Sequence, residues 1–137
     1  MAGLRIGYGI GNEEIIKYMN IVRKPYNVNS LAQAVALASL SNPSIVSLNN
    51  KLNKKRKQYL YSAFLRLGIN FVPTEANFIF VNTGMDSKDL CEKLIYQGVL
   101  VRAGYVFGYP EFIRVTIGKD EENKKLVRAL KKIILGE

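Results

Sequence analysis

Histidine and tryptophan are absent from this chain of 137 residues, and cysteine occurs once, as Cys91. Without histidine, the chain cannot build a serine–histidine or cysteine–histidine nucleophile system, and it has no histidine metal site. One cysteine cannot make a disulfide framework and is typical of a reducing compartment, so we expect a cytoplasmic location. Since no apolar run is long enough to cross a bilayer, we expect neither a membrane partner nor a signal peptide.

Acidic residues are scarce as well: 11 Asp and Glu face 20 Lys and Arg, which gives a net charge of +9. A basic chain favours anionic partners such as nucleic acid, anionic lipid or phosphorylated small molecules. The charges recur at helix-surface spacing, which favours a lysine-coated surface. The basic run at residues 51–57 leaves a nucleic-acid-binding module as an alternative. No recognised nucleic-acid motif or aromatic platform supports that alternative, so we expect no nucleic acid partner.

The first part of the chain reads as a strand and two helices without a sheet. Residues 4–11 resemble a short strand that runs into a glycine-rich turn. One helix follows Asn12 and ends at Pro25, and a second, alanine-rich helix begins after Asn29. A strand needs neighbours to pair with, and none follows nearby. We therefore expect residues 1–41 to belong to a larger sheet whose remainder lies upstream of the chain.

From Pro43 onward the pattern predicts an α/β unit. Pro43 begins a long amphipathic helix that ends at Gly68. Short apolar strands then alternate with helices, and the strands are expected at residues 69–72, 78–82, 99–102 and 112–117. The helices between and after them are expected at residues 87–97 and from residue 120 onward. The sequence thus divides into residues 1–41 and residues 42–137.

Three arginines stand in otherwise apolar segments. Alternation along residues 112–117 turns Ile113 and Val115 toward the core and Arg114 toward the other face. Arg102 has the same character on the neighbouring strand, so the two could form one wall for an anion, or each could be a surface arginine at a sheet edge. Arg5 stands beside the glycine-rich turn, where a buried carboxylate and a cofactor phosphate are equally suited partners. The glycine spacing there fits neither the dinucleotide nor the P-loop pattern.

Five stretches of the chain together resemble pyridoxal-phosphate (PLP) aminotransferases of the large aspartate-aminotransferase-like class, in their histidinol-phosphate branch. The resemblance runs from residue 2 to about residue 135, with the motifs in order and at the right spacing. These stretches are residues 2–8 (AGLRIGY), 22–29 (VRKPYNVN), 73–78 (PTEANF), 98–102 (GVLVR) and 113–118 (IRVTIG).

The resemblance implies a fold and a role for several residues. Residues 42–137 would be the carboxy-terminal small domain, with a small mixed sheet and helices on one face, and residues 1–41 a remnant of the large PLP domain. Arg5 would hold the cofactor phosphate and Arg114 the substrate α-carboxylate. Arg102 would help to bind the substrate phosphate. Tyr26 and Asn27 would lie near the active site or the dimer contact.

The resemblance also implies a reaction, amino transfer between L-histidinol phosphate and 2-oxoglutarate in histidine biosynthesis by a homodimer. PLP would do the carbanion chemistry. In the family the Schiff-base lysine precedes the segment at residues 2–8, so it would fall upstream of Met1. We therefore expect a fragment without a catalytic residue, inactive alone and without bound PLP. A related enzyme, threonine-phosphate decarboxylase, is the nearest alternative.

The isolated chain is also expected to self-associate. The stripe of Ile15, Ile16 and Met19 and the alanine-rich helix after it would present apolar faces meant for an absent partner.

Overall fold

The computed structural model describes residues 2–136, which form two compact units that divide between residues 49 and 50. A single long helix, α3 (Pro43–Arg66), contributes residues to both units. The domain boundary expected between residues 41 and 42 stays a prediction, because compactness of contacts alone does not define a domain.

The first unit is helical. Each of its two α-helices begins at an asparagine whose side chain accepts a backbone N–H of the first turn, as helix N-caps do. Asn12 Oδ1 accepts from Glu14 N at 2.9 Å, and Asn29 Oδ1 accepts from Ala32 N at 2.8 Å. Its elements besides the start of α3 are η1 (Ala2–Leu4), α1 (Glu13–Val22) and α2 (Ser30–Leu40).

The strand expected over residues 4–11 is wrong. The short 3-10 helix η1 occupies its beginning, Arg5 turns the chain with a φ of 56°, and irregular backbone continues to Asn12. A left-handed residue interrupts the extended run that a strand requires. No strand in residues 2–49 is present to pair with this segment, so its backbone has no ladder to join.

Apolar side chains of α1 and α2 remain largely exposed. Helix α1 buries none of its residues, and α2 buries only Ala32. Their large exposed apolar side chains are Ile15, Tyr18, Met19, Ile21, Val22, Leu31, Leu37 and Leu40. The apolar faces expected to lack a partner are therefore present in the first unit.

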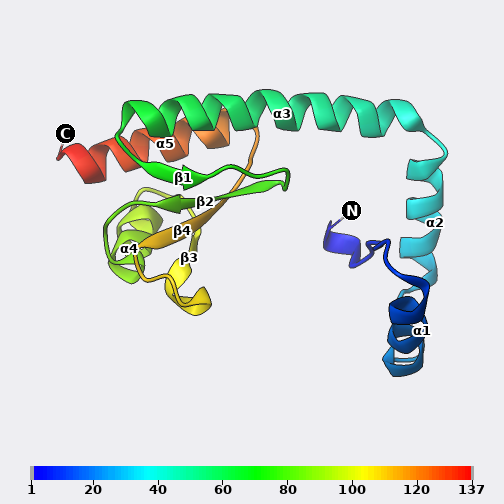
Figure 1. Cartoon of the computed structure of the whole chain (residues 1–137). Coiled ribbons are helices and arrows are strands. Elements are labelled where there is room, and N and C mark those ends of the chain that lie inside the picture. The colour runs from blue at the N-terminus through cyan, green and yellow to red at the C-terminus, as the bar shows by residue number, and fades with distance from the viewer. Residues whose placement is uncertain (1, 137) are drawn as a thin grey trace. The chain divides into compact units, whose positions relative to one another are not determined.

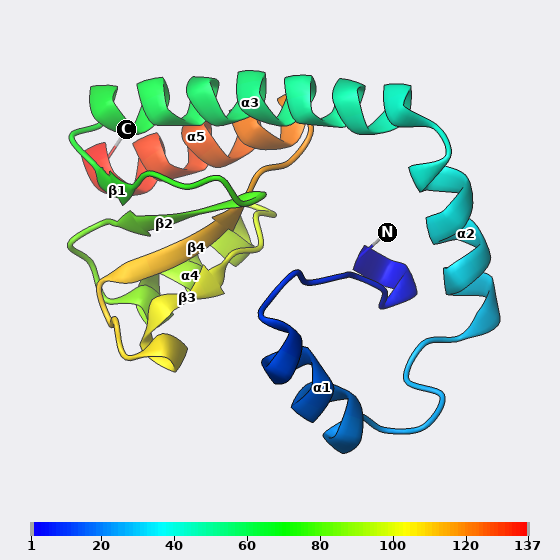
Figure 2. The same ribbon diagram turned by 45° about the vertical axis from the view of Figure 1, so that its right-hand side comes forward.

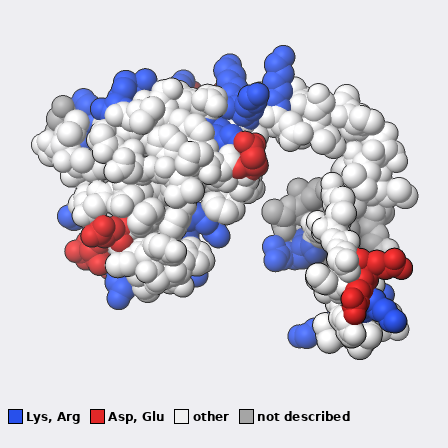
Figure 3. All heavy atoms as spheres, viewed as in Figure 1, with Lys and Arg blue, Asp and Glu red and all other residues white. Residues whose placement is uncertain are grey.

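Helix α3 is 24 residues long and begins at Pro43, as expected for proline at a first helical position. Lys and Arg side chains project from its outer edge in Figure 3, along the line where Figure 1 draws α3. Across residues 2–136 no single helix is both long and apolar enough to cross a membrane. Only the pair of α2 and α3, bent by 85°, passes on length and composition.

The second unit is built on a sheet of four strands in the order β1-β2-β4-β3, and every pairing between them is antiparallel. We expected a mixed sheet, and this expectation is wrong, because every pairing is antiparallel. Strands β2 and β3 run in the same direction on either side of a helix, as the alternating pattern suggests, but β4 lies between them and opposes both. The strands are β1 (Asn70–Val72), β2 (Phe78–Asn82), β3 (Arg102–Ala103) and β4 (Phe112–Thr116).

Helices cover one face of this sheet, as expected. Figures 1 and 2 show α3 and α5 side by side along the sheet, with α4 against the same layer. Ile113 and Val115 point from β4 into the core and are 0% and 1% exposed, which confirms the alternation expected for this strand. The helices are α4 (Ser87–Tyr96) and α5 (Asp120–Leu135), and the core also contains Leu60, Phe64, Ile79, Val81, Leu90, Leu94, Leu126 and Leu130.

A buried lysine fastens the β1–β2 loop to α3. Lys57 is only 6% exposed, and its Nζ donates to Thr74 O at 2.6 Å and to Glu75 Oε2 at 3.1 Å. The Tyr61 hydroxyl accepts from Thr74 N at 2.9 Å. Burial of the ammonium is tolerated because both acceptors face it.

An exposed ion pair joins α3 to α5. Arg56 Nε donates to Asp120 Oδ1 at 2.8 Å. This hydrogen bond, with the nearby positive charges, lowers the pKa of Asp120 from its ordinary value. A lowered carboxyl pKa stabilises the folded state above the pKa of the unfolded chain, and the contribution disappears as the pH falls through the folded pKa.

Replacing Asp120 by Asn should therefore remove a pH-dependent part of the stability. We expect urea midpoints of Asp120→Asn and the unmodified chain to differ at about pH 6 and to converge toward about pH 2. Glu92→Gln, at an exposed position on α4, is the matched control. Its urea midpoint should change between the two pH values as much as that of the unmodified chain. If the urea midpoints of the two proteins differ by the same amount at all pH values, the ion pair between Arg56 and Asp120 does not account for the difference.

Candidate functional site

The face of the sheet opposite the helices carries an aromatic cluster. Phe80 of β2 stacks on Phe112 of β4 with ring centroids 4.7 Å apart. Tyr109 and Phe107 approach Phe80 edge-on, at 5.5 Å and 6.3 Å between centroids. We call Phe80, Phe107, Tyr109 and Phe112 the open-face aromatic cluster. These rings form an apolar surface beside one polar side chain of the same sheet face.

That polar group is Arg114, the half-buried middle residue of β4. Its Cζ lies 5.3 Å from the centroid of Phe78 and 5.7 Å from the centroid of Phe107. Each cation–π contact contributes about 0.5–1 kcal/mol and restricts the guanidinium plane. The Nε atom is buried without a hydrogen-bond partner. A buried donor without an acceptor is costly, so the guanidinium is suited to an anion that would compensate it.

Arg102 stands directly opposite Arg114 in the register of β3 and β4. Side chains that are directly opposite share one face of a sheet, and two like charges in that relation repel. Within residues 2–136, neither arginine forms an ion pair with an acidic side chain. Arg102 is exposed. Two uncompensated cations at one register position make a local positive field that attracts anions.

Arg5, Tyr26 and Asn27 belong to the first unit. All three side chains are exposed, and that of Tyr26 is 99% exposed. Arg5 and Tyr26 have φ values of 56° and 55°, and they are the non-glycine residues with positive φ among those described. Left-handed backbone is costly for such residues and is concentrated at functional sites. An exposed guanidinium on this turn fits a phosphate, whose oxygens match its donor fork.

Comparison with known proteins decides the family. The description "Aminotransferase class I and II" matches residues 1–130.

The chain belongs to the class I and II aminotransferase family.

Individual relatives agree with this assignment. A histidinol-phosphate aminotransferase of Moorella thermoacetica is 48% identical over 134 residues, which cover 98% of this aminotransferase chain and 35% of the relative. The crystal structure of the histidinol-phosphate aminotransferase from Clostridium acetobutylicum matches with a TM-score of 0.83 and 25% identity, over 100% of this chain and 43% of that one. The aminotransferase chain thus spans about a third of the length of the curated relative it matches.

A decarboxylase structure shares the fold. The L-threonine-O-3-phosphate decarboxylase from Porphyromonas gingivalis matches with a TM-score of 0.76 and 24% identity, over 98% of this chain and 43% of that one. At this identity the likeness concerns the fold alone.

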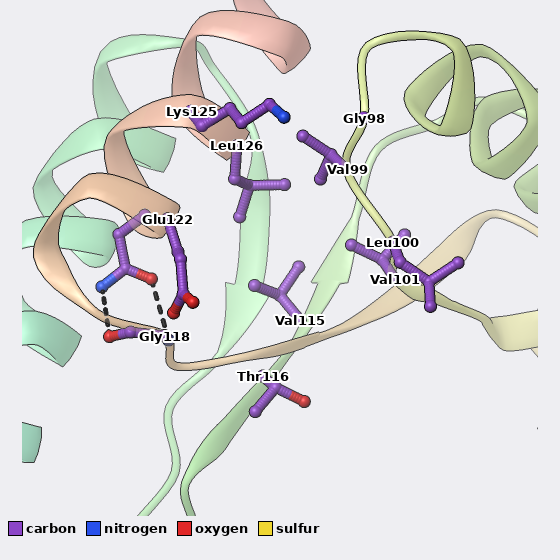
Figure 4. Close-up of a pocket in the computed structure, with 11 residues that line it drawn as sticks. Gly98, Val99, Leu100, Val101, Val115, Thr116, Gly118, Glu122, Lys125 and Leu126 are labelled. Atoms are coloured by element: carbon purple, nitrogen blue, oxygen red, sulfur yellow. Dashed lines mark hydrogen bonds between the residues drawn. The ribbon is translucent and has the colours of Figure 1, made fainter.

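A cavity of about 390 Å³ in the second unit has no arginine in its lining. Figure 4 shows it between the segment from Gly98 to Val101 and the start of α5, with Val115 and Thr116 of β4 at its floor. Its one carboxylate, Glu122, already accepts the backbone N–H of Lys119 at 2.6 Å. The lining of this cavity includes none of the predicted site residues.

Sequence reasoning missed the loop at residues 104–110, which supplies Phe107 and Tyr109 to the aromatic cluster. A signal was available, since the loop reads Gly-Tyr-Val-Phe-Gly-Tyr-Pro between two apolar strands. Gly104 is required for its path: a Cβ there would lie 2.4 Å from Phe112 O and 2.5 Å from Tyr109 O. Both neighbours are backbone atoms, so they cannot yield as a flexible side chain would.

Substituting Gly104 by Ala should therefore destabilise the second unit by about 1–3 kcal/mol, the range for forced overpacking. Gly7→Ala is the control, because no atom lies within 4 Å of its added Cβ. Chemical unfolding followed by circular dichroism measures both. Equal midpoints for Gly104→Ala and the unmodified chain would contradict the close approach.

Proposed function

We propose that this chain supplies the substrate-anion contacts of a PLP-dependent aminotransferase that acts on L-histidinol phosphate and 2-oxoglutarate. The observation that carries the proposal is the register pair of Arg102 and Arg114, uncompensated and backed by aromatic rings. The 48% identity to the Moorella thermoacetica enzyme over nearly the whole chain supports this choice of substrate. The activity belongs to the longer protein that such relatives represent.

The two substrates explain why two arginines stand together. Histidinol phosphate presents a phosphate, whereas 2-oxoglutarate and glutamate present carboxylates. A guanidinium fork binds either group through two parallel hydrogen bonds. We assign Arg114 to the α-carboxylate and Arg102 to the substrate phosphate. Because both stand at one register position, an anion at either guanidinium also feels the charge of the other.

The cofactor would be held in part by this chain. We assign Arg5 to the phosphate of PLP, since its exposed guanidinium matches phosphate geometry. PLP, when bound, supplies an electron sink for the carbanion formed at the substrate. We assign the lysine that carries PLP to a part of the enzyme outside residues 2–12, which contain none. We assign Tyr26 and Asn27 to the edge of the active site or to the dimer contact.

The test is a chimera. This chain replaces the matching part of the Moorella thermoacetica enzyme, and glutamate production from histidinol phosphate and 2-oxoglutarate is measured. We expect transamination in the chimera, and about a 100-fold loss of kcat/KM in Arg114→Ala, because a half-buried charged contact to the substrate is removed. The loss in Arg102→Ala should be smaller, since that side chain is exposed.

Arg128→Ala, an exposed arginine of α5, is the matched control and should retain activity. A folded chimera that produces no glutamate from histidinol phosphate would contradict the proposed choice of substrate. Release of carbon dioxide from threonine phosphate would favour the decarboxylase instead.

We further propose a cytoplasmic homodimer for the longer enzyme and self-association for the isolated chain. The support for self-association is the exposed apolar side chains of α1 and α2. Burying such faces is favourable by roughly 25 cal/mol for each Å² of apolar surface.

Self-association should depend on Ile15 and Met19, which are 58% and 57% exposed. Sedimentation equilibrium of the unmodified chain should give a mass that rises with concentration, and the double variant Ile15→Lys, Met19→Lys should sediment closer to the monomer. Lys17→Gln on the same helix is the control and should behave as the unmodified chain. A monomer at every concentration would contradict the interface.

A further inference from the structure

Phe107, one of the two rings that hold Arg114, does not belong to the sheet. It lies in η2 (Gly104–Phe107), a short 3-10 turn between β3 and β4. Phe78, the other ring, is a residue of β2, paired with Thr116 of β4. The sheet itself therefore fixes Phe78. Phe107 needs an anchor of a different kind.

The anchor is one serine at the first turn of α4. Ser87 is 0% exposed and is one of three polar or charged residues that are buried within residues 2–136. Its N–H donates to Pro110 O at 2.7 Å, and its Oγ accepts from Tyr105 N at 3.3 Å. One buried residue thus binds both ends of the loop that carries Phe107.

Contacts inside the loop make it a single rigid piece. Tyr109 N donates to Gly104 O at 3.1 Å, and Gly108 ends η2 in the left-handed conformation with a φ of 82°. The backbone of Gly104 leaves no room for a side chain. Beside the anchor, Lys88 Nζ lies 4.6 Å from the centroid of the Tyr105 ring. A displacement at Ser87 would therefore move the whole loop, Phe107 included.

We propose that Ser87 is a positioning residue for Arg114: its hydroxyl holds the Tyr105 end of the 104–110 loop and its backbone N–H holds the Pro110 end, so that the Phe107 ring fixes the guanidinium on the open face of the sheet. Ser87 itself touches neither the substrate nor the cofactor. Its effect passes through Tyr105 to Phe107 and from that ring to Arg114. The consequence for anion binding rests on the proposed function, whereas the positioning of the guanidinium does not.

Nuclear magnetic resonance of the isotope-labelled full chain tests the positioning directly. The Nε–Hε signal of Arg114, assigned by its loss in Arg114→Lys, should be displaced by the ring currents of both Phe78 and Phe107. Ser87→Ala removes the bond to Tyr105 and keeps the backbone bond to Pro110, so the part due to Phe107 should fall toward its value in the benchmark Phe107→Leu while the part due to Phe78 remains. Ser62→Ala, at an exposed position of α3, should leave the signal unchanged. An Arg114 signal at the same position in Ser87→Ala as in the unmodified chain would overturn the proposal.

A second measurement needs no variant. The amide of Tyr105, bonded to Ser87 Oγ, should exchange its hydrogen more slowly than the exposed amides of the same loop. If the Tyr105 amide exchanges as fast as those exposed amides, Ser87 does not anchor the loop. This result does not depend on whether Ser87→Ala folds.

Titration with inorganic phosphate separates this proposal from the proposed function. We expect Ser87→Ala to bind phosphate about two- to five-fold more weakly, the factor for loss of one cation–π contact, and Arg114→Ala to lose binding at this site. If the unmodified chain does not bind phosphate but the ring-current shift of Arg114 changes as expected, the proposed anion site is wrong and the positioning role of Ser87 is retained. Equal phosphate affinity in Ser87→Ala and the unmodified chain would overturn the role of Ser87 in binding.

Discussion

The antiparallel pairing of β4 with both β2 and β3 constrains the whole second unit. The register that turns Ile113 and Val115 into the core also turns Arg114 to the opposite face and sets Arg102 beside it. A slip of one residue would bury the guanidinium and expose both apolar side chains. The free energy of the hydrophobic core therefore holds the two cations together against their repulsion.

Much of this arrangement could be predicted from local chemistry. Asparagine caps and Pro43 predict where the helices begin, because each satisfies or tolerates the unpaired N–H groups of a first turn. The period of two along β4 predicts the two faces of that strand. The orientation of Arg114 follows from the same period and from the apolar character of its neighbours. These features depend only on residues close in sequence.

Features that depend on distant partners could not be predicted in this way. Alternating strands and helices favour parallel neighbours, and nothing local reveals that β4 inserts between β2 and β3. An apolar run beginning at Leu4 looks extended until Arg5 adopts a left-handed conformation. Ser87 resembles an ordinary residue of a helix first turn, and only the folded chain brings it to Tyr105 and Pro110.

The hydrogen bonds of Lys57 give the second unit a mechanical linkage. The ammonium couples α3 to the loop that leads directly into Phe78, and Phe78 lies against Arg114. The pairing of Phe78 with Thr116 holds that residue from the side of the sheet, so the lysine fixes the backbone before Phe78 and the sheet fixes Phe78 itself. Loss of the lysine contacts would therefore free the loop at residues 73–77 and leave the Phe78 ring in place beside Arg114.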